Sequence, residues 1–269
     1  MSYGFKKKIP SPWLFTLTIV TLLFICIPMV VSVMAGFVQN YSVGLKSGLT
    51  YRWFEQVWAV YSGTIGWSIL LALACVVVTV LIGVPCAYAF ARSNNRWLKV
   101  LDEFIALPIA IPGLASALAL ILAYGHIQWF RQSYWFILIG HVVFTLPFMI
   151  KTVTAAFKKH ELFALEEAAR SLGANFTTRF LGVLVPAILP SIIAACLMVF
   201  TLSIGEFNLT WMLHTPMTRT LPVGLADSYA SMRIEVGSAY TFIFFLVILP
   251  FLYGLQTVAT YFQRRYGTF

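Results

Sequence analysis

Long apolar runs alternate along the chain with short polar segments. A window of about 20 residues, the length that crosses a bilayer as a helix, locates them at Trp13–Val38, Thr64–Ala91, Leu101–Tyr124, Tyr134–Phe157, Ala187–Met212 and Ala239–Phe262. No polar segment between them is long enough to form a domain of its own. The pattern predicts an all-α integral membrane protein, with residues 1–269 forming a single transmembrane domain of six helices.

Three stretches depart from this simple pattern. The first run is too long for the core of a signal peptide and is read as an uncleaved span. The segment Gln39–Gly63 has the composition of a short interfacial helix. The third run contains Pro108, Pro112 and Gly113, which should break or kink its helix. Such a break lines a cavity in transporters, and a simple packing kink is the alternative.

Composition and charge narrow the class of protein and orient it. Charged residues make up 10% of the chain, against about 25% in soluble domains, which excludes a soluble enzyme. The net charge of +9 would suggest nucleic acid in a soluble protein, but here it indicates basic cytoplasmic loops and membrane lipid around the chain. With the N-terminus inside, both termini are cytoplasmic. The basic residues left outside are then Lys46, Arg52, Arg131, Arg219 and Arg233.

No catalytic or metal-binding pattern stands out. The four cysteines lie in apolar runs without the spacing of a zinc site, and His126 and His141 are expected to have structural roles. The chain has no GxxxxGK[ST] phosphate loop, so we expect neither ATP nor Mg to bind to it.

The largest cytoplasmic segment, about residues 158–186, predicts a short helix with one apolar face. Its apolar residues recur at i, i+3, i+4 and i+7, which places them on one stripe. They are Leu165, Ala168, Ala169 and Leu172. Glu166 lies off this stripe, four residues before Arg170, and is the better candidate for a local pair with it. Glu167 can pair with Arg170 at i+3 or interact with a partner protein, and the better placement of Glu166 for Arg170 favours the partner.

Signals for a turn and a second helix follow directly. Gly173 suits the left-handed position after a helix, Asn175 suits an N-cap, and Pro186 should stop the second helix. Such a helix–turn–helix lies outside the bilayer and can dock in a groove of another protein. The alternative is a helix lying on the membrane surface.

The spacing of this loop resembles the EAA motif of ABC-importer permeases. The motif is Glu-Ala-Ala, three residues, Gly, nine residues and Ile-x-Leu-Pro. Here it reads Glu167-Ala168-Ala169, then Gly173, then Val183-Leu184-Val185-Pro186, with valines at the Ile and Leu positions. Residues 107–120, 144–148 and 200–206 also resemble type I permeases, most closely the second permease of the spermidine/putrescine group, which includes phosphonate and ferric-ion permeases.

The resemblance implies a type I permease fold in a bacterial cytoplasmic (inner) membrane. It implies a cytoplasmic ATPase dimer that binds ATP and Mg, a second permease subunit related to this one, and an extracytoplasmic solute-binding protein. It does not imply a nucleic-acid partner. The residues it assigns to ATPase coupling are Glu167, Ala168, Ala169, Leu172, Gly173, Val183 and Pro186.

The resemblance also assigns a solute path. Its residues are Pro112, Gly113, Ser203, Glu206 and Arg219. Glu206 corresponds to an acid of the polyamine-type permeases and could meet a cationic group, or it could pair with Arg219 or Arg233. Polyamine relatives carry further acids where this chain has Gly113 and Gly205, so a mixed-charge solute such as an aminophosphonate fits better. A stand-alone secondary transporter or channel is the alternative, but it would need buried acids in several spans.

Overall fold

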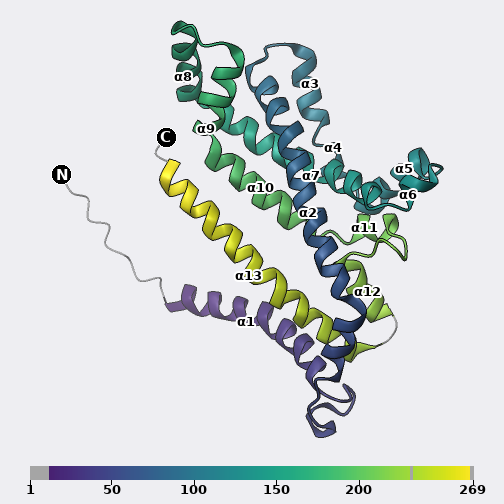
Figure 1. The fold of residues 1–269 in the computed structure, drawn as a ribbon. Coiled ribbons are helices and arrows are strands. Elements are labelled where there is room, and N and C mark those ends of the chain that lie inside the picture. The colour runs from purple at the N-terminus through teal and green to yellow at the C-terminus, as the bar shows by residue number, and fades with distance from the viewer. Residues whose placement is uncertain (1–11, 231–232, 267–269) are drawn as a thin grey trace. The chain divides into compact units, whose positions relative to one another are not determined.

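The computed structural model describes residues 12–230 and 233–266. Their regular structure is helical apart from one isolated bridge between Val38 and Leu49. The chain divides into two compact units, one formed by Met1–Val60 with Ser228–Phe245 and the other by Tyr61–Asp227 with Leu246–Phe269. The helices α2 and α13 contribute residues to both units (Figure 1).

Most of the chain lies in a few long helices. They are α1 (Pro12–Met34), α2 (Arg52–Arg92), α7 (Tyr134–Phe157) and α13 (Ile234–Tyr266). Each is long and apolar enough to cross a membrane, with α1 continued by the 3-10 turn η1 (Ala35–Phe37). The other elements are η2 (Gly44–Ser47), α3 (Arg96–Phe104), α4 (Leu107–Ala110), α5 (Gly113–Tyr124), α6 (Gln128–Arg131), α8 (His160–Ser171), the π-helix η3 (Thr178–Leu184), α9 (Val185–Ala187), α10 (Leu189–Ile204), α11 (Asn208–Leu213) and α12 (Leu221–Ala230).

The first unit combines an exposed helix with a small aromatic cluster. The helix α1 is apolar on every side and buries none of its residues, as expected for a helix whose solvent is lipid. The rings of Phe37, Phe54 and Phe242 lie 4.7–5.5 Å apart. Gly36 allows a close approach there, because a Cβ on it would lie 2.6 Å from the backbone nitrogen of Ala239.

The second unit is built around α7, which matches the fourth predicted span from end to end. Its buried residues include Phe136, Met149, Ile150 and Phe157. It packs most extensively against α10, whose Ala195 and Val199 are also buried. This pair of helices forms the apolar core that positions the segments described below.

Two of the predicted spans are broken. Residues 96–110 and 113–124 meet at 106°, and residues 178–187 and 189–204 meet at 72°. The first break follows from Pro112, because Ile111 before it is extended, with φ −84° and ψ 129°. The predicted break at Pro112 and Gly113 is therefore confirmed. If each bent pair is one span, the described residues hold up to six spans. The count of six and the cytoplasmic side of both termini stay predictions.

Several predicted boundaries were wrong because hydropathy marks the apolar part of a helix and not its ends. The helix α2 begins at Arg52 instead of Thr64, so residues 39–63 hold η2 and the start of α2 rather than a separate interfacial helix. The fifth predicted span ends at Ile204, and the residues after Glu206 form the separate helix α11.

The prediction that Pro186 stops the second loop helix was also wrong. Pro186 lies in the first turn of α9, where a helix does not need the missing N–H. The turns before it form the π-helix η3, and the backbone interruption comes later, at Ile188.

Candidate functional site

The predicted turn between the two loop helices is confirmed in detail. Gly173 has φ +81°, the left-handed conformation that a side chain disfavours. Its N–H donates to the carbonyl of Arg170 at 2.9 Å, and the N–H of Ala174 donates to Ala169 at 3.1 Å. This pair of hydrogen bonds is a Schellman motif and ends α8. The conformation of Gly173 therefore sets the direction in which the chain leaves α8.

The second helix begins as predicted at Asn175. Its Oδ1 accepts a hydrogen bond from the N–H of Thr178 at 2.8 Å, which is the contact of an N-cap. Farther along, Val183 is half-buried and Pro186 is exposed, whereas Leu184 between them is fully buried. The motif positions of this helix thus alternate between the core of the unit and its surface.

The predicted apolar stripe of α8 faces away from the rest of the unit. Leu165 is 41% exposed, Leu172 is 88% exposed and Ala168 is also exposed, while Ala169 is half-buried. The buried residues of α8 are Leu162 and Glu166. The stripe is therefore a free apolar surface on an otherwise anchored helix.

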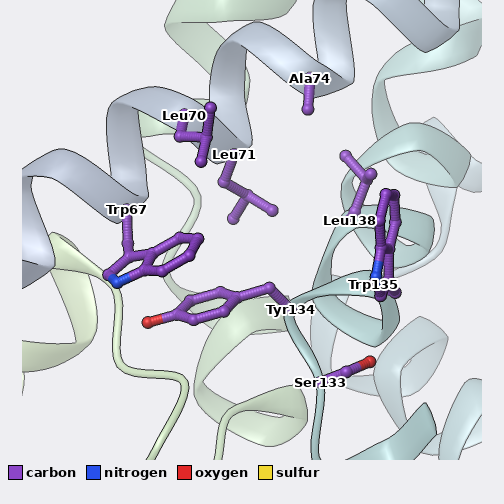
Figure 2. Close-up of a pocket in the computed structure, with 8 residues that line it drawn as sticks. All are labelled: Trp67, Leu70, Leu71, Ala74, Ser133, Tyr134, Trp135 and Leu138. Carbon is purple, nitrogen blue, oxygen red and sulfur yellow. The ribbon is translucent and has the colours of Figure 1, made fainter.

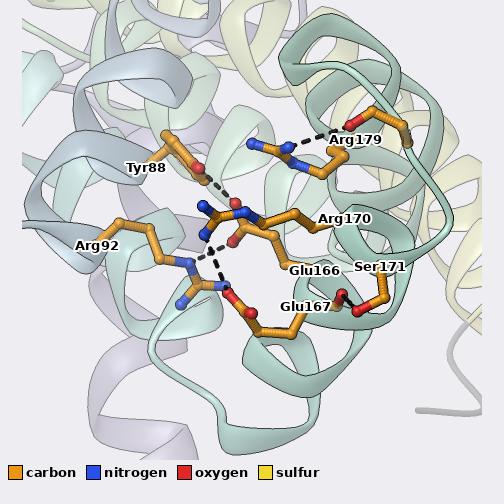
Figure 3. A network of polar contacts seen from close by, with 8 residues as sticks. Tyr88, Arg92, Glu166, Glu167, Arg170, Ser171 and Arg179 are labelled. Atoms are coloured by element: carbon orange, nitrogen blue, oxygen red, sulfur yellow. Dashed lines mark hydrogen bonds and ion pairs between the residues drawn. The ribbon is translucent and has the colours of Figure 1, made fainter.

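The inner face of α8 carries an ion pair that the sequence did not predict. Glu166 is only 9% exposed, and its Oε2 accepts from Nε of Arg92 at 2.6 Å. Its Oε1 accepts from the hydroxyl of Tyr88 at 2.5 Å. The expected pairing of Glu166 with Arg170 was thus wrong, because Glu166 turns inward to the end of α2 (Figure 3).

Arg92 extends this network to a third helix. Its Nη1 donates to the carbonyl of Phe157, the last residue of α7, at 2.9 Å. Its guanidinium also lies 5.2 Å from the ring centre of Phe163 on α8, within the range of a cation–π contact. One side chain thus joins the ends of α2 and α7 to α8.

Glu167, the next residue of α8, is exposed. Its side chain is 54% exposed and pairs weakly with Arg170, with Nη1 and Oε1 3.9 Å apart. An exposed i,i+3 pair contributes at most a few tenths of a kcal/mol. Glu167 therefore remains available to a partner, and its role in coupling stays a prediction.

The break between α4 and α5 lies next to the turn between α10 and α11. Together they bring two predicted solute-path residues close to each other. Glu206 Oε1 accepts from the N–H of Leu209 at 2.6 Å and so caps α11. A Cβ on Gly113, the first residue of α5, would lie 3.4 Å from the same oxygen. Pro112 lies directly before Gly113 and is exposed. Two interrupted helices and one carboxylate are thus placed side by side.

Arg219 and Arg233 each have a partner within their own unit. Nη1 of Arg219 lies 3.5 Å from Oδ2 of Asp227, and Nη2 of Arg233 donates to Oε1 of Gln56 at 3.2 Å. The alternative in which Glu206 forms an external ion pair with Arg219 was therefore wrong, because Arg219 pairs with Asp227.

Ser203 is buried instead of lining an open path. It is 3% exposed, and its hydroxyl lies 2.8 Å from Nδ1 of His141. The other ring nitrogen of His141, Nε2, lies 2.8 Å from the hydroxyl of Thr210. His141 thus joins α7 to α10 and α11, which is the structural role expected for it. Neither partner could be inferred from spacing in the sequence, because each lies more than 60 residues away.

An apolar groove lies elsewhere in the second unit, between α2 and α7. Its volume is about 520 Å³, and the rings of Trp67 and Tyr134 stack in it 4.5 Å apart (Figure 2). Its other lining residues are Leu70, Leu71, Ala74, Ser133, Trp135 and Leu138. Without a charged side chain, this groove offers nothing to a charged solute. Nowhere in residues 12–230 and 233–266 do three His, Cys, Asp or Glu side chains converge as a metal site requires.

Comparison with known proteins supports the assignment from the loop motif. The family described as "Binding-protein-dependent transport system inner membrane component" matches residues 80–268. A relative from Salmonella choleraesuis (strain SC-B67), named as the 2-aminoethylphosphonate transport system permease protein PhnV, is 26% identical over 92% of this chain and 94% of its own. The putrescine transport system permease protein PotI of Escherichia coli (strain K12) is 25% identical over 84% and 82%.

A solved structure shows the same fold. It belongs to a bacterial ABC transporter that imports the acidic polysaccharide alginate, and it matches with a TM-score of 0.67 at 19% identity. The match covers 95% of this chain and 99% of the other. From the motif, the match over residues 80–268 and the fold, the chain belongs to the binding-protein-dependent transport system inner membrane components, the permeases of ABC importers.

Proposed function

We propose that this chain and a second, related permease subunit form the path of a small polar solute across a bacterial inner membrane. A separate cytoplasmic ATPase dimer, which holds ATP and Mg, drives the transport. An extracytoplasmic protein delivers the solute.

One observation carries the coupling part of this proposal. The helix α8 is anchored by its buried inner face, while its apolar stripe around Leu165 and Leu172 is exposed. An exposed apolar stripe on a fixed short helix suits docking in a groove of a partner protein. Of the motif residues, Ala168 belongs to this surface, Gly173 directly follows it, and Glu167 lies on another side of the helix. Closure of the ATPase dimer would move α8 and switch the spans between two arrangements.

The proposed solute class rests on Glu206. It is half-buried where two helix breaks meet, beside Gly113, and a carboxylate at such a break can bind a cationic group. The names of the two relatives give 2-aminoethylphosphonate and putrescine as their solutes, and both solutes carry an amino group. We propose a solute of this aminophosphonate or polyamine class, with its ammonium group at Glu206.

The coupling is tested by co-expressing the chain with its ATPase and the second permease, followed by purification and reconstitution in liposomes. We expect one stable complex that imports solute only when ATP is hydrolysed. Import by this chain alone, without an ATPase, would refute the coupling and support a stand-alone transporter.

The solute class is tested with 2-aminoethylphosphonate and putrescine as probes. Glu206→Gln keeps an oxygen for the N–H of Leu209 but removes the charge, so we expect it to weaken import of the accepted probe at least tenfold. Glu55→Gln, at an exposed acid in the first turn of α2, is the matched control and should leave import unchanged. Equal import by the wild type and Glu206→Gln would contradict the role of Glu206.

A further inference from the structure

The buried face of α8 lies next to its exposed stripe and connects the helix to the rest of the second unit. The buried residues of this face are Leu162 and Glu166, and both carboxylate oxygens of Glu166 have partners within the second unit. Exposed acids on the same helix, such as Glu161, show that charge is tolerated at its surface. A buried carboxylate at this place therefore calls for a specific role.

The partners of Glu166 belong to the ends of long helices. Tyr88 and Arg92 lie one turn apart in the last turns of α2, and Arg92 is its last residue. Arg92 also binds the carbonyl of Phe157 at the end of α7. That carbonyl has no partner within its own helix, so Arg92 closes the end of α7 and holds Glu166 of α8 at the same time.

The surroundings make this connection stiff. The ring of Tyr88 is packed edge-on against Phe157, Phe176 and Phe180, at centroid distances of 5.3–5.7 Å. The Arg92 side chain is largely buried, and an arginine held by bonds from two different nitrogens has a fixed orientation. Movement of Glu166 would therefore displace Arg92 and Tyr88 with it instead of being absorbed by a flexible side chain.

We propose that Glu166, Arg92 and Tyr88 form a positioning link that makes α8 move as one body with the ends of α2 and α7. The inference rests on the proposed function and adds how motion of the ATPase reaches the spans. The exposed stripe of α8 provides docking, and the buried link converts motion of the docked helix into motion of the spans. Without the link, α8 still docks, but ATP hydrolysis no longer drives import.

The test uses the complete complex of both permeases and the ATPase in liposomes, with the solute-binding protein and the probes 2-aminoethylphosphonate and putrescine. The measured quantity is the number of probe molecules imported per ATP hydrolysed. Glu166→Gln should leave assembly and ATP hydrolysis in place and reduce this ratio at least tenfold. Glu161→Gln, an exposed acid on the same helix, is the control and should keep the wild-type ratio.

Two further variants guard against simple misfolding. Tyr88→Phe removes one hydrogen bond but keeps the packed ring, so it should assemble and reduce the ratio in the same direction, by less. Arg92→Lys keeps the charge but lacks the two donor groups of the guanidinium. We therefore expect it to assemble and to lower the ratio of probe imported per ATP. If both variants assemble and retain the wild-type ratio, the inference is overturned.

A distance measurement tests the link without any solute. Spin labels are placed at Ser171→Cys, the exposed last residue of α8, and at Leu81→Cys, an exposed position on α2, after the native cysteines are replaced by alanine. In the wild-type background the distance should be the same with and without ATP, and in Glu166→Gln it should change. A wild-type distance that changes with ATP, or a Glu166→Gln distance that does not, refutes the link. A wild-type complex that never forms would instead count against the proposed function.

Discussion

Replacing Gly173 should change the direction in which the chain leaves α8 without removing any side chain that could bind the ATPase. Gly173 has φ +81°, and a Cβ placed on it meets no atom within 4 Å. Any loss is therefore conformational rather than steric. An alanine in the left-handed region costs about 1–2 kcal/mol, which changes the ratio of correctly directed to misdirected loops by about 5–30-fold. The two hydrogen bonds that end α8 require the left-handed conformation at residue 173, so an alanine there either accepts this cost or loses both bonds.

The effect should depend on the type of side chain at Gly173. Asparagine tolerates left-handed backbone and valine does not, so the loss should increase from Gly173→Asn through Gly173→Ala to Gly173→Val. The assay is the affinity of the purified permease complex for its ATPase, together with ATP-driven uptake. We expect weakening of up to about 30-fold for Gly173→Ala, the bound set by the backbone cost.

A glycine in the same loop provides the control. Gly182 lies in η3 with negative φ, and a Cβ on it would meet only Cγ2 of Thr178, at 4.0 Å. Gly182→Ala should therefore bind the ATPase as the wild type does. The reasoning is refuted if Gly173→Asn is as damaging as Gly173→Val, or if Gly173→Ala behaves like the wild type.

Three other glycines give predictions, two of opposite sign for thermal stability and one for transport. Gly36→Ala should lower the melting temperature of the purified protein, because its Cβ would lie 2.6 Å from the backbone of Ala239 and such overpacking costs about 1–3 kcal/mol. Gly63→Ala, in the exposed part of α2 with open space around it, should raise stability by about 0.5–1 kcal/mol, and equal melting points for both variants would contradict this. Gly113→Val should displace the carboxylate of Glu206, 3.4 Å from its Cβ position, and reduce uptake while assembly persists; unchanged uptake would show that the two breaks do not form one site.

Local signals in the sequence were reliable because they depend on neighbouring residues. The turn at Gly173 and the cap at Asn175 were predicted from positions a few residues apart, and both are present. The fourth span was predicted to the residue because polar sequence flanks an unbroken apolar helix on both sides. The break at Pro112 followed from the extended conformation that a proline favours in the residue before it, here Ile111.

Long-range pairings could not be predicted in the same way. The local rule placed Glu166 with Arg170, but burial turned it to Arg92, 74 residues earlier in the chain. His141 likewise binds partners more than 60 residues away. The fifth predicted span was extended past Glu206, because a hydropathy window averages over many residues. It therefore missed the interruption at Gly205 and Glu206, where α10 ends. The site is thus assembled by contacts that a single sequence does not encode in its spacing.

The coupling role of α8 is tested most directly by cross-linking in the assembled transporter. Leu172→Cys places a thiol on the exposed stripe of the loop, where the native side chain is 88% exposed. In the complex with the ATPase, a short bifunctional reagent should join this thiol to the ATPase subunit in high yield. The cross-link should abolish ATP-driven uptake, and its reductive cleavage should restore it. A thiol at Leu172 that reacts equally with and without the ATPase, and is never joined to it, would contradict the account.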